Sequence, residues 1–314
     1  MQDNRFQILA LDGGGLKGLF TASFLAHWEK ERGTRVIDHF DLISGTSTGG
    51  IIAIGLGLGF SAEQIKDLYL NKADQIFPPR HFANAKHWLA VKHSGDGLRA
   101  ALQELLGERK FGESEKRLVI PAFDPAFRGV HIFKTSHHKR LQTDYKQSAV
   151  HVAMATSAAP TYLPPEVTES GLQLLDGGVW ANNPIMIAVA EALGYLEKPQ
   201  CEIAALRVGT TEEVISLKDL QTMGGKLQMA APVIDFMMRG QSQSASGMVH
   251  HLLGKDRFLE INPKTAPGDF HLDKLSKELL AMGEAEWRHA SSELFDRGFF
   301  DHQAAPFEPC HKLN

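Results

Sequence analysis

The sequence has little cysteine, no excess of positive charge and no long apolar run, and each absence excludes a class of protein. Only two cysteines, Cys201 and Cys310, occur in 314 residues. This excludes a disulfide framework and indicates a reducing compartment. The formal net charge is -4, so no global positive field favours a nucleic-acid polymer as partner. The first residues lack the basic and apolar segments of a signal peptide.

The most apolar stretch is too short to cross a membrane. Residues 49–60 contain only 12 residues, five of them glycine, whereas a transmembrane helix needs about 18 or more apolar residues. The composition, 43% hydrophobic and 22% charged, is that of a globular protein with a large core. We therefore expect a cytoplasmic protein whose contact with any membrane is peripheral.

Apolar runs and helical patterns alternate along the first two thirds of the chain. The runs at 6–11, 40–43, 118–123, 172–175 and 201–208 predict strands. Helical patterns between most of them predict an α/β layer fold. Past Gly209 the chain is mostly helical and more polar, and we expect it to pack on the same domain. The prediction is one domain over 1–314, with a helical C-terminal part at 211–314.

Three of the predicted strands are followed by glycine-rich turns. These are residues 12–15 (DGGG), 45–49 (GTSTG) and 176–178 (DGG). In an open α/β sheet the carboxyl ends of the strands form the ligand crevice. We therefore expect the three turns to form one site.

The second turn has the pattern of a nucleophile elbow. In G-x-S-x-G, Gly45 and Gly49 allow a tight turn that exposes the oxygen of Ser47 over the end of the sheet. A serine needs an adjacent base to attack a carbonyl. Asp176, at a strand end before Gly177, is the carboxylate best placed for that role, although a simple turn carboxylate is the alternative.

The first turn offers backbone donors. Gly13, Gly14 and Gly15 could direct N–H groups at a developing oxyanion, or cradle a nucleotide phosphate instead. Lys17 follows in the first turn of the next helix, where it could orient this loop, meet an anionic head group, or simply face solvent.

No histidine, metal or cofactor motif accompanies these turns. The chain has 15 histidines, none in a diagnostic setting, and it lacks the spacing of zinc and calcium sites. Only one strand–helix unit precedes Ser47, whereas an ordinary α/β-hydrolase has several strands before its elbow. We expect neither a metal nor a cofactor.

Taken together, the three turns resemble the motifs of the patatin-like phospholipase family. Residues 12–18 (DGGGLKG), 45–49 and 176–178 match its D-G-G-G-x-[RK]-G, G-x-S-x-G and D-G-[GA] patterns in order. Residues 156–160 (TSAAP) resemble its A-S-x-A-x-P block, with Thr for the first Ala, and residues 182–184 (NNP) fit as well. The resemblance covers about residues 6–210.

This resemblance implies a fold and a reaction. The fold would be a three-layer α/β sandwich with a mainly parallel sheet and helices on both faces. Ser47 would be the nucleophile and Asp176 its base, without histidine. Residues 13–15 would form the oxyanion hole, and Lys17 would stand where the family often has Arg. The reaction would be hydrolysis of membrane phospholipid acyl esters through an acyl-enzyme.

A narrower resemblance concerns regulation. Residues 238–242 (MRGQS) and 252–254 (LLG) are similar to bacterial antiphage effectors, phospholipases that a cyclic dinucleotide activates. A housekeeping lysophospholipase or esterase is one alternative. A catalytically silent nucleotide- or lipid-binding regulator is another. The sequence does not indicate an oligomeric state, nor a preference for head group or acyl position.

Residues 77–97 interrupt the alternating pattern and are the best match for a lid. Their mixture of aromatic and basic side chains suits a membrane interface. The alternative is a loop that Phe82 and Trp88 pack on the core.

Overall fold

The computed structural model describes residues 4–78, 91–168, 171–214, 226–266 and 268–313, with the backbone alone for 226–235. Five parallel strands form the centre of the sheet in the order β3-β2-β1-β7-β9. Their bounds are β1 Phe6–Leu11, β2 Leu42–Gly45, β3 Arg117–Asp124, β7 Ile203–Val208 and β9 Phe258–Ile261. Every residue of β1 is buried, as expected for a strand covered on both faces.

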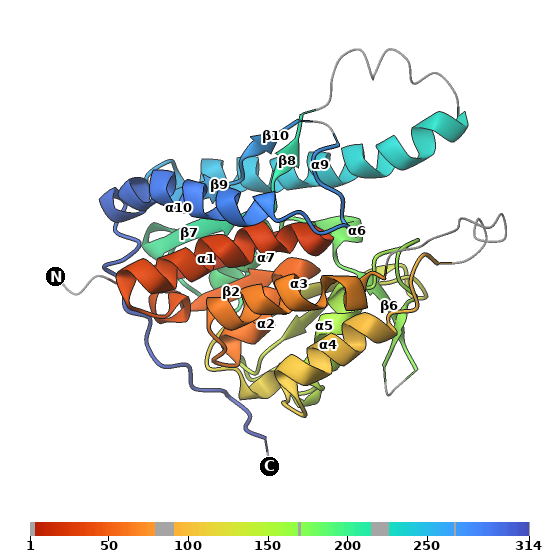
Figure 1. Ribbon diagram of the computed structural model, residues 1–314. Coiled ribbons are helices and arrows are strands. Elements are labelled where there is room, and N and C mark those ends of the chain that lie inside the picture. Colours follow the sequence, from red (N-terminus) through yellow and green to blue (C-terminus); the bar gives the residue numbers. More distant parts are fainter. Residues whose placement is uncertain (1–3, 79–90, 169–170, 215–225, 267, 314) are drawn as a thin grey trace.

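Helices cover both faces of this sheet (Figure 1). Alternate side chains of β1 point in opposite directions, so Leu9 and Leu11 join one hydrophobic cluster and Ile8 and Ala10 join the other. The first cluster packs α1 Gly18–Arg32, α2 Thr48–Gly57, α3 Ala62–Ile76, α4 Asp96–Leu106, α5 Ala149–Thr156 and α10 Glu278–Asp296. The second packs α7 Ile185–Gly194 and α9 Lys226–Leu253. The predicted three-layer α/β sandwich with a mainly parallel sheet is confirmed.

Three further strands complete the sheet. β4 Gly129–Lys134 and β6 Gln173–Asp176 pair antiparallel with β3, and β5 Glu166–Val167 pairs antiparallel with β6. The strands β2, β4 and β6 all pair with β3. The residues of β3 that pair with β4 include residues that also pair with β2 and with β6, so β2 and β6 must both lie on the other edge of β3. Since β2 is parallel to β3 and β6 is antiparallel, β2 and β6 run toward each other, and their carboxyl ends meet head to head.

The last third of the chain belongs to the same layers. β9 extends the sheet beside β7, so the prediction of a mostly helical segment missed a strand. α10 packs along α1, where Trp287 contacts the rings of Phe24 and Trp28. A methyl group at Gly283 would lie 2.7 Å from the carbonyl oxygen of Phe20, so a glycine permits this close approach. A short pair, β8 Glu212–Glu213 and β10 Lys264–Thr265, lies outside the main sheet.

Local signals in the sequence explain where several helices begin. Ser61 and Gln64 form a capping box at the start of α3, with each side chain bonded to the other residue's backbone N–H. α7 begins at Ile185, directly after Pro184. The Asn183 Oδ1 accepts the Ile185 N–H at 3.0 Å. Among the described residues, no helix is long and apolar enough to cross a bilayer.

Candidate active site

Ser47 occupies a strained turn between β2 and α2. Its backbone has φ 54° and ψ -122°, a conformation that a non-glycine residue rarely adopts. Glycines on both sides make the turn possible. A Cβ at Gly45 would lie 2.1 Å from the carbonyl oxygen of Gly49, and a Cβ at Gly49 would lie 2.2 Å from that of Leu11. The geometry is that of a nucleophile elbow.

Thr156, at the end of α5, holds the backbone of this turn. The Ser47 N–H donates to Thr156 Oγ1 at 3.1 Å, and that hydroxyl donates to the Pro121 carbonyl at 2.6 Å. The Thr156 side chain is fully buried. The Ser47 turn is therefore tied to β3 through one threonine hydroxyl.

The segment from Thr156 to Ala158 also holds Asp176. The Asp176 N–H donates to the Ala158 carbonyl at 3.0 Å, and the Gly177 N–H donates to the Thr156 carbonyl at 3.2 Å. A Cβ at Gly177 would lie 2.4 Å from the Pro121 carbonyl oxygen, so glycine is required there. Residues 156–158 thus hold both the Ser47 turn and Asp176.

Asp176 reaches the site by a route that differs from the prediction. We expected three strand ends to meet at one edge of the sheet, but β6 is antiparallel to β3. Ser44 of β2 pairs with Val119, whereas Asp176 pairs with Ala122. The two ends approach from opposite directions and leave only two residues of β3 between them. This convergence brings Asp176 to Ser47.

The Asp176 carboxyl group is buried and perturbed. It is 5% exposed, and burial raises its pKa to about 6. Two contacts oppose this shift. The Gly178 N–H donates to Oδ1 at 2.6 Å, and a side-chain hydrogen bond from Ser47 also lowers the pKa. A carboxylate with a pKa near neutrality is suited to proton transfer.

No described histidine contributes to this pair. Within residues 4–78, 91–168, 171–214, 226–266 and 268–313, neither side chain of the pair bonds to an imidazole. The same ranges contain no group of three or more His, Cys, Asp or Glu side chains able to hold a metal ion. The arrangement supports attack by serine with a carboxylate as base.

The glycine loop after β1 supplies donors beside Ser47. The Gly13 N–H already donates to the Asn182 carbonyl at 3.0 Å. In the part of the chain that the structure describes, the N–H groups of Gly14 and Gly15 meet no acceptor. Gly15 has φ +57°, and a Cβ there would lie 2.2 Å from the Leu272 carbonyl oxygen. Of the three expected donors, two are therefore open.

Lys17 binds the loop to the segment after β7. It ends a short 3₁₀ helix, Gly15–Lys17, and its Nζ donates to the Thr211 carbonyl at 3.4 Å. The Thr210 hydroxyl donates to the Gly13 carbonyl at 2.9 Å on the same side. Of the alternatives open for Lys17, this contact supports the orientation of the loop.

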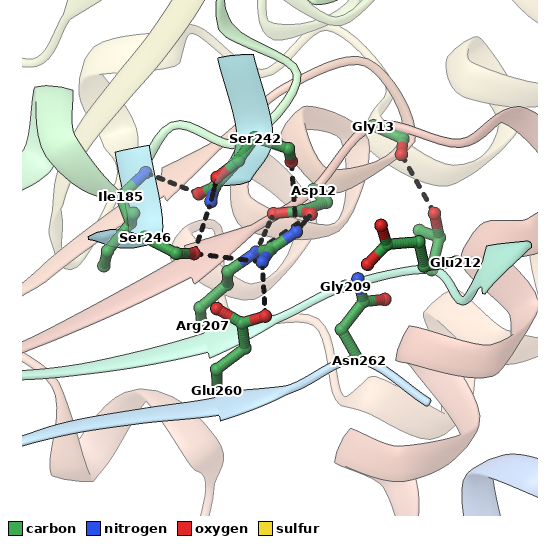
Figure 2. Close-up of polar contacts among 12 residues, drawn as sticks. Asp12, Gly13, Ile185, Arg207, Gly209, Glu212, Ser242, Ser246, Glu260 and Asn262 are labelled. Carbon is green, nitrogen blue, oxygen red and sulfur yellow. Dashed lines mark hydrogen bonds and ion pairs between the residues drawn. The ribbon is translucent and has the colours of Figure 1, made fainter. Parts of the chain in front are cut away.

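A buried ion pair anchors the loop, and the sequence analysis did not identify it. Figure 2 shows the Arg207 guanidinium against the carboxylate of Asp12, the residue before Gly13. Arg207 Nε lies 3.1 and 3.0 Å from the two Asp12 oxygens, and Nη2 bonds to Asp12 as well. Both side chains are buried, so each charge needs the other. The sequence did contain a sign of this ion pair, because an arginine inside the apolar run of β7 needs a buried partner of opposite charge.

The helix α9 contributes the remaining contacts to this network. Arg207 Nη2 donates to Ser242 Oγ at 3.1 Å, and Nη1 donates to Ser246 Oγ at 3.0 Å. Asn183 Nδ2 donates to the Ser242 carbonyl at 3.0 Å and to Ser246 Oγ at 3.1 Å. One helix face therefore holds both the anchor of the glycine loop and the turn that follows Asp176.

The predicted lid cannot be placed. Most of residues 77–97, including Phe82 and Trp88, falls in 79–90, outside the described residues. The residues that flank it on the carboxyl side join the fold, since the N–H groups of Lys92 and His93 donate to the carbonyls of Thr161 and Tyr162 at 2.8 Å.

The chain is similar to several known proteins. The model of the patatin-like phospholipase family matches residues 9–189. The chain is 31% identical over 308 residues to the cGAMP-activated phospholipase of Pseudomonas aeruginosa, covering 97% of this chain and 90% of that protein. It is 31% identical to the protein of the same name from Vibrio cholerae, covering 94% and 92%. Among solved structures it is similar to VipD from Legionella pneumophila, with 14% identity, a TM-score of 0.49 and coverage of 93% and 67%.

Proposed function

The chain belongs to the patatin-like phospholipase family, a family of lipid-ester hydrolases, and we propose that Ser47 and Asp176 form its catalytic dyad. The observation that carries the proposal is the strained Ser47 turn against a buried carboxyl whose pKa is raised to about 6. Their chemistry is complementary, because a serine becomes a nucleophile only when a nearby base removes its proton.

The proposed reaction has two steps. Ser47 Oγ attacks the acyl carbonyl while Asp176 takes the hydroxyl proton, and the carbonyl oxygen becomes an oxyanion. As the ester C–O bond breaks, Asp176 returns the proton to the departing alcohol and leaves an acyl-enzyme. Water, deprotonated by the same carboxylate, then releases the fatty acid and restores Ser47.

The open amides of the glycine loop would stabilise both oxyanions. Gly14 and Gly15 each have an N–H without an acceptor among the described residues, whereas the Gly13 N–H is bonded to Asn182. The Asp12–Arg207 pair and the Thr210 bond hold this loop. Fixed donors need no reorganisation as charge develops, which is why such loops accelerate acyl transfer. We assign the oxyanion hole to Gly14 and Gly15, with Gly13 as its support.

Phospholipid substrate implies peripheral contact with a membrane, and exposed apolar side chains beyond the carboxyl end of β3 support it. Phe127, in the turn between β3 and β4, is 79% exposed. Val130, Val167 and Val179 are exposed on the neighbouring β4, β5 and α6 Gly178–Ala181. We propose that this apolar rim, defined by these four residues, contacts the inner membrane while the dyad acts on a lipid ester.

The names of the relatives support a regulated enzyme. Three bacterial relatives at about 30% identity, one each from Pseudomonas aeruginosa, Vibrio cholerae and Escherichia coli, are named cGAMP-activated phospholipases. We propose that a cyclic dinucleotide activates this chain too, in the setting of antiphage defence.

Lipid mass spectrometry tests the proposal. Purified wild type and Ser47→Ala are incubated with phospholipid vesicles, with and without cGAMP, and a fluorophosphonate probe reports on Ser47. We expect fatty acid release and probe labelling from wild type alone, increased by the nucleotide. An unlabelled Ser47 and equal lipid profiles for the two proteins would instead support a silent nucleotide- or lipid-binding regulator. Release without any effect of nucleotide would support a housekeeping enzyme.

A further inference from the structure

A cavity of about 350 Å³ lies between the C-terminal half of α9, strand β9 and Arg297 at the end of α10. Its polar lining comprises Ser246, His250, His251, Lys255, Glu260 and Arg297, and Phe258 and Leu259 add apolar surface. The volume is within the range of small-molecule sites. None of these lining residues belongs to the proposed dyad or oxyanion hole.

The lining is rich in donors that have no acceptor. The rings of His250 and His251 meet edge to face, 6.2 Å apart. Among the described residues neither ring bonds to an acceptor, and Lys255 is exposed and forms no ion pair. Arg297 is fixed to the wall by the carbonyls of Lys255 and Phe258. Imidazole and ammonium donors beside aromatic carbon suit a ligand that combines phosphate with a heterocyclic base.

Ser246 also has a hydrogen to donate into this cavity. Its Oγ accepts N–H bonds from Arg207 at 3.0 Å and from Asn183 at 3.1 Å. Both lone pairs of the hydroxyl are then used, and its own O–H has no acceptor in the described part of the chain. The one carboxylate in the lining, Glu260, forms an ion pair with Arg207 Nη1 at 2.7 Å, and Arg207 is shared with Asp12. Lys255 and Arg297 give the lining two cationic side chains against this one carboxylate.

The floor of the cavity connects directly to the active site. Ser246 and Glu260 both contact Arg207, and Arg207 binds Asp12 next to the glycine loop (Figure 2). Ser246 also binds Asn183, in the turn whose Asn182 carbonyl accepts the Gly13 N–H. A molecule that displaces Ser246 or Glu260 must change how Arg207 and Asn183 hold the loop. Linkage then requires that the state of the loop alters affinity in the cavity.

We propose that this cavity is the regulatory site for the activating cyclic dinucleotide, which rests on the activation included in the proposed function. A phosphodiester of the ligand binds Lys255 and the imidazoles of His250 and His251. The Ser246 hydroxyl donates to the ligand, and the change passes through Arg207 to Asp12 and the donors of the oxyanion hole.

Direct binding of cGAMP, measured by calorimetry, and its dose–response for ester hydrolysis test the site. Lys255→Glu and His250→Ala change exposed side chains, so folding is not threatened. We expect each to weaken cGAMP binding about tenfold or more, as loss of a charge-assisted contact would, with activity in the absence of nucleotide unchanged. The matched control is Lys30→Glu, which changes an exposed lysine of α1 in a second cavity. This variant should bind cGAMP as tightly as wild type does.

The outcomes separate this inference from the proposed function. If both variants bind cGAMP as tightly as wild type does, the cavity is not the binding site, even if cGAMP activates the enzyme. No binding of cGAMP to wild type overturns both the site and activation, whereas lipid hydrolysis that depends on Ser47 would still stand. Ser246→Ala tests the connection. It should bind cGAMP within about threefold of wild type yet lose most of the activation, and full activation would refute the route through Arg207.

Discussion

The backbone N–H of Ser47 donates a hydrogen bond to Oγ1 of Thr156, 109 residues away in the sequence. The same hydroxyl donates to β3, so one side chain holds the strained turn against the sheet. Thr156 touches neither substrate nor the reacting oxygen in the proposed reaction, which makes it a positioning residue.

Thr156→Val keeps the shape of the side chain and removes the hydroxyl. We expect kcat on a soluble ester to fall about tenfold, the equivalent of one lost buried hydrogen bond, with KM little changed. Thr156→Ser retains the hydroxyl and should recover most of the loss. The rate of fluorophosphonate labelling should fall in parallel, and equal labelling of the Val and wild-type proteins would contradict the role.

The raised pKa of Asp176 predicts the pH dependence of activity. As a base the carboxyl must be ionised, so kcat/KM should rise about tenfold per pH unit below its pKa of about 6 and level off above it. The measurement is kcat/KM on a soluble ester between pH 4.5 and 8, and a profile that is flat across pH 6 would exclude this assignment.

The same shift predicts that Asp176 lowers stability at high pH. In the folded protein the pKa of Asp176 lies above the ordinary value of 3.8. Below pH 3.8 the carboxyl is neutral in both the folded and the unfolded chain, so folding loses no stability there. The free energy of unfolding then falls as pH rises through 6, because the buried group becomes charged. At pH 8 the buried charge costs about 3 kcal/mol. Asp176→Asn should therefore be inactive but melt roughly 5 °C higher at pH 8, with a smaller difference at pH 5. A lower Tm than wild type at pH 8 would contradict the buried, destabilising charge.

Two helical glycines form a matched pair for testing the elbow. A methyl at Gly49 would lie 2.2 Å from the Leu11 carbonyl oxygen, whereas a methyl at Gly194 would meet nothing within 4 Å. We expect Gly49→Ala to cost about 2–3 kcal/mol in the free energy of unfolding, and Gly194→Ala to be neutral or to gain about 0.5 kcal/mol. Denaturant unfolding measures both, and equal effects would refute the close packing of the elbow.

The apolar rim predicts a difference between aggregated and soluble substrates. Phe127→Ser should lower hydrolysis of vesicle phospholipid about tenfold, since burial of a phenylalanine stabilises by about 1.5–3 kcal/mol, and leave a soluble ester unaffected. Phe295, 58% exposed on α10, provides the control, because Phe295→Ser should change neither rate. Equal losses on both substrates for Phe127→Ser would argue against membrane contact.

The sequence predicted the parts of the fold and site that local pattern determines. Apolar runs located the main strands up to β7, and the glycine turns located Ser47, Asp176 and the donor loop. The antiparallel entry of β6 was not predicted, because strand direction depends on pairing with β3, which no local pattern specifies. β9 was missed because Glu260 interrupts its short apolar run. The contacts of Arg207 were missed because its partners, Asp12 and α9, lie far away in the sequence.

The Asp12–Arg207 pair has a consequence for synthesis of the chain. Ser47, Asp176 and the glycine loop are all translated by residue 176, but the anchor of the loop comes at Arg207 and its neighbours at Ser242 and Ser246. A nascent chain that has not yet released these residues from the ribosome carries Ser47, Asp176 and the glycine loop without the contacts that hold the loop. The loop can therefore reach its final arrangement only after α9 has folded.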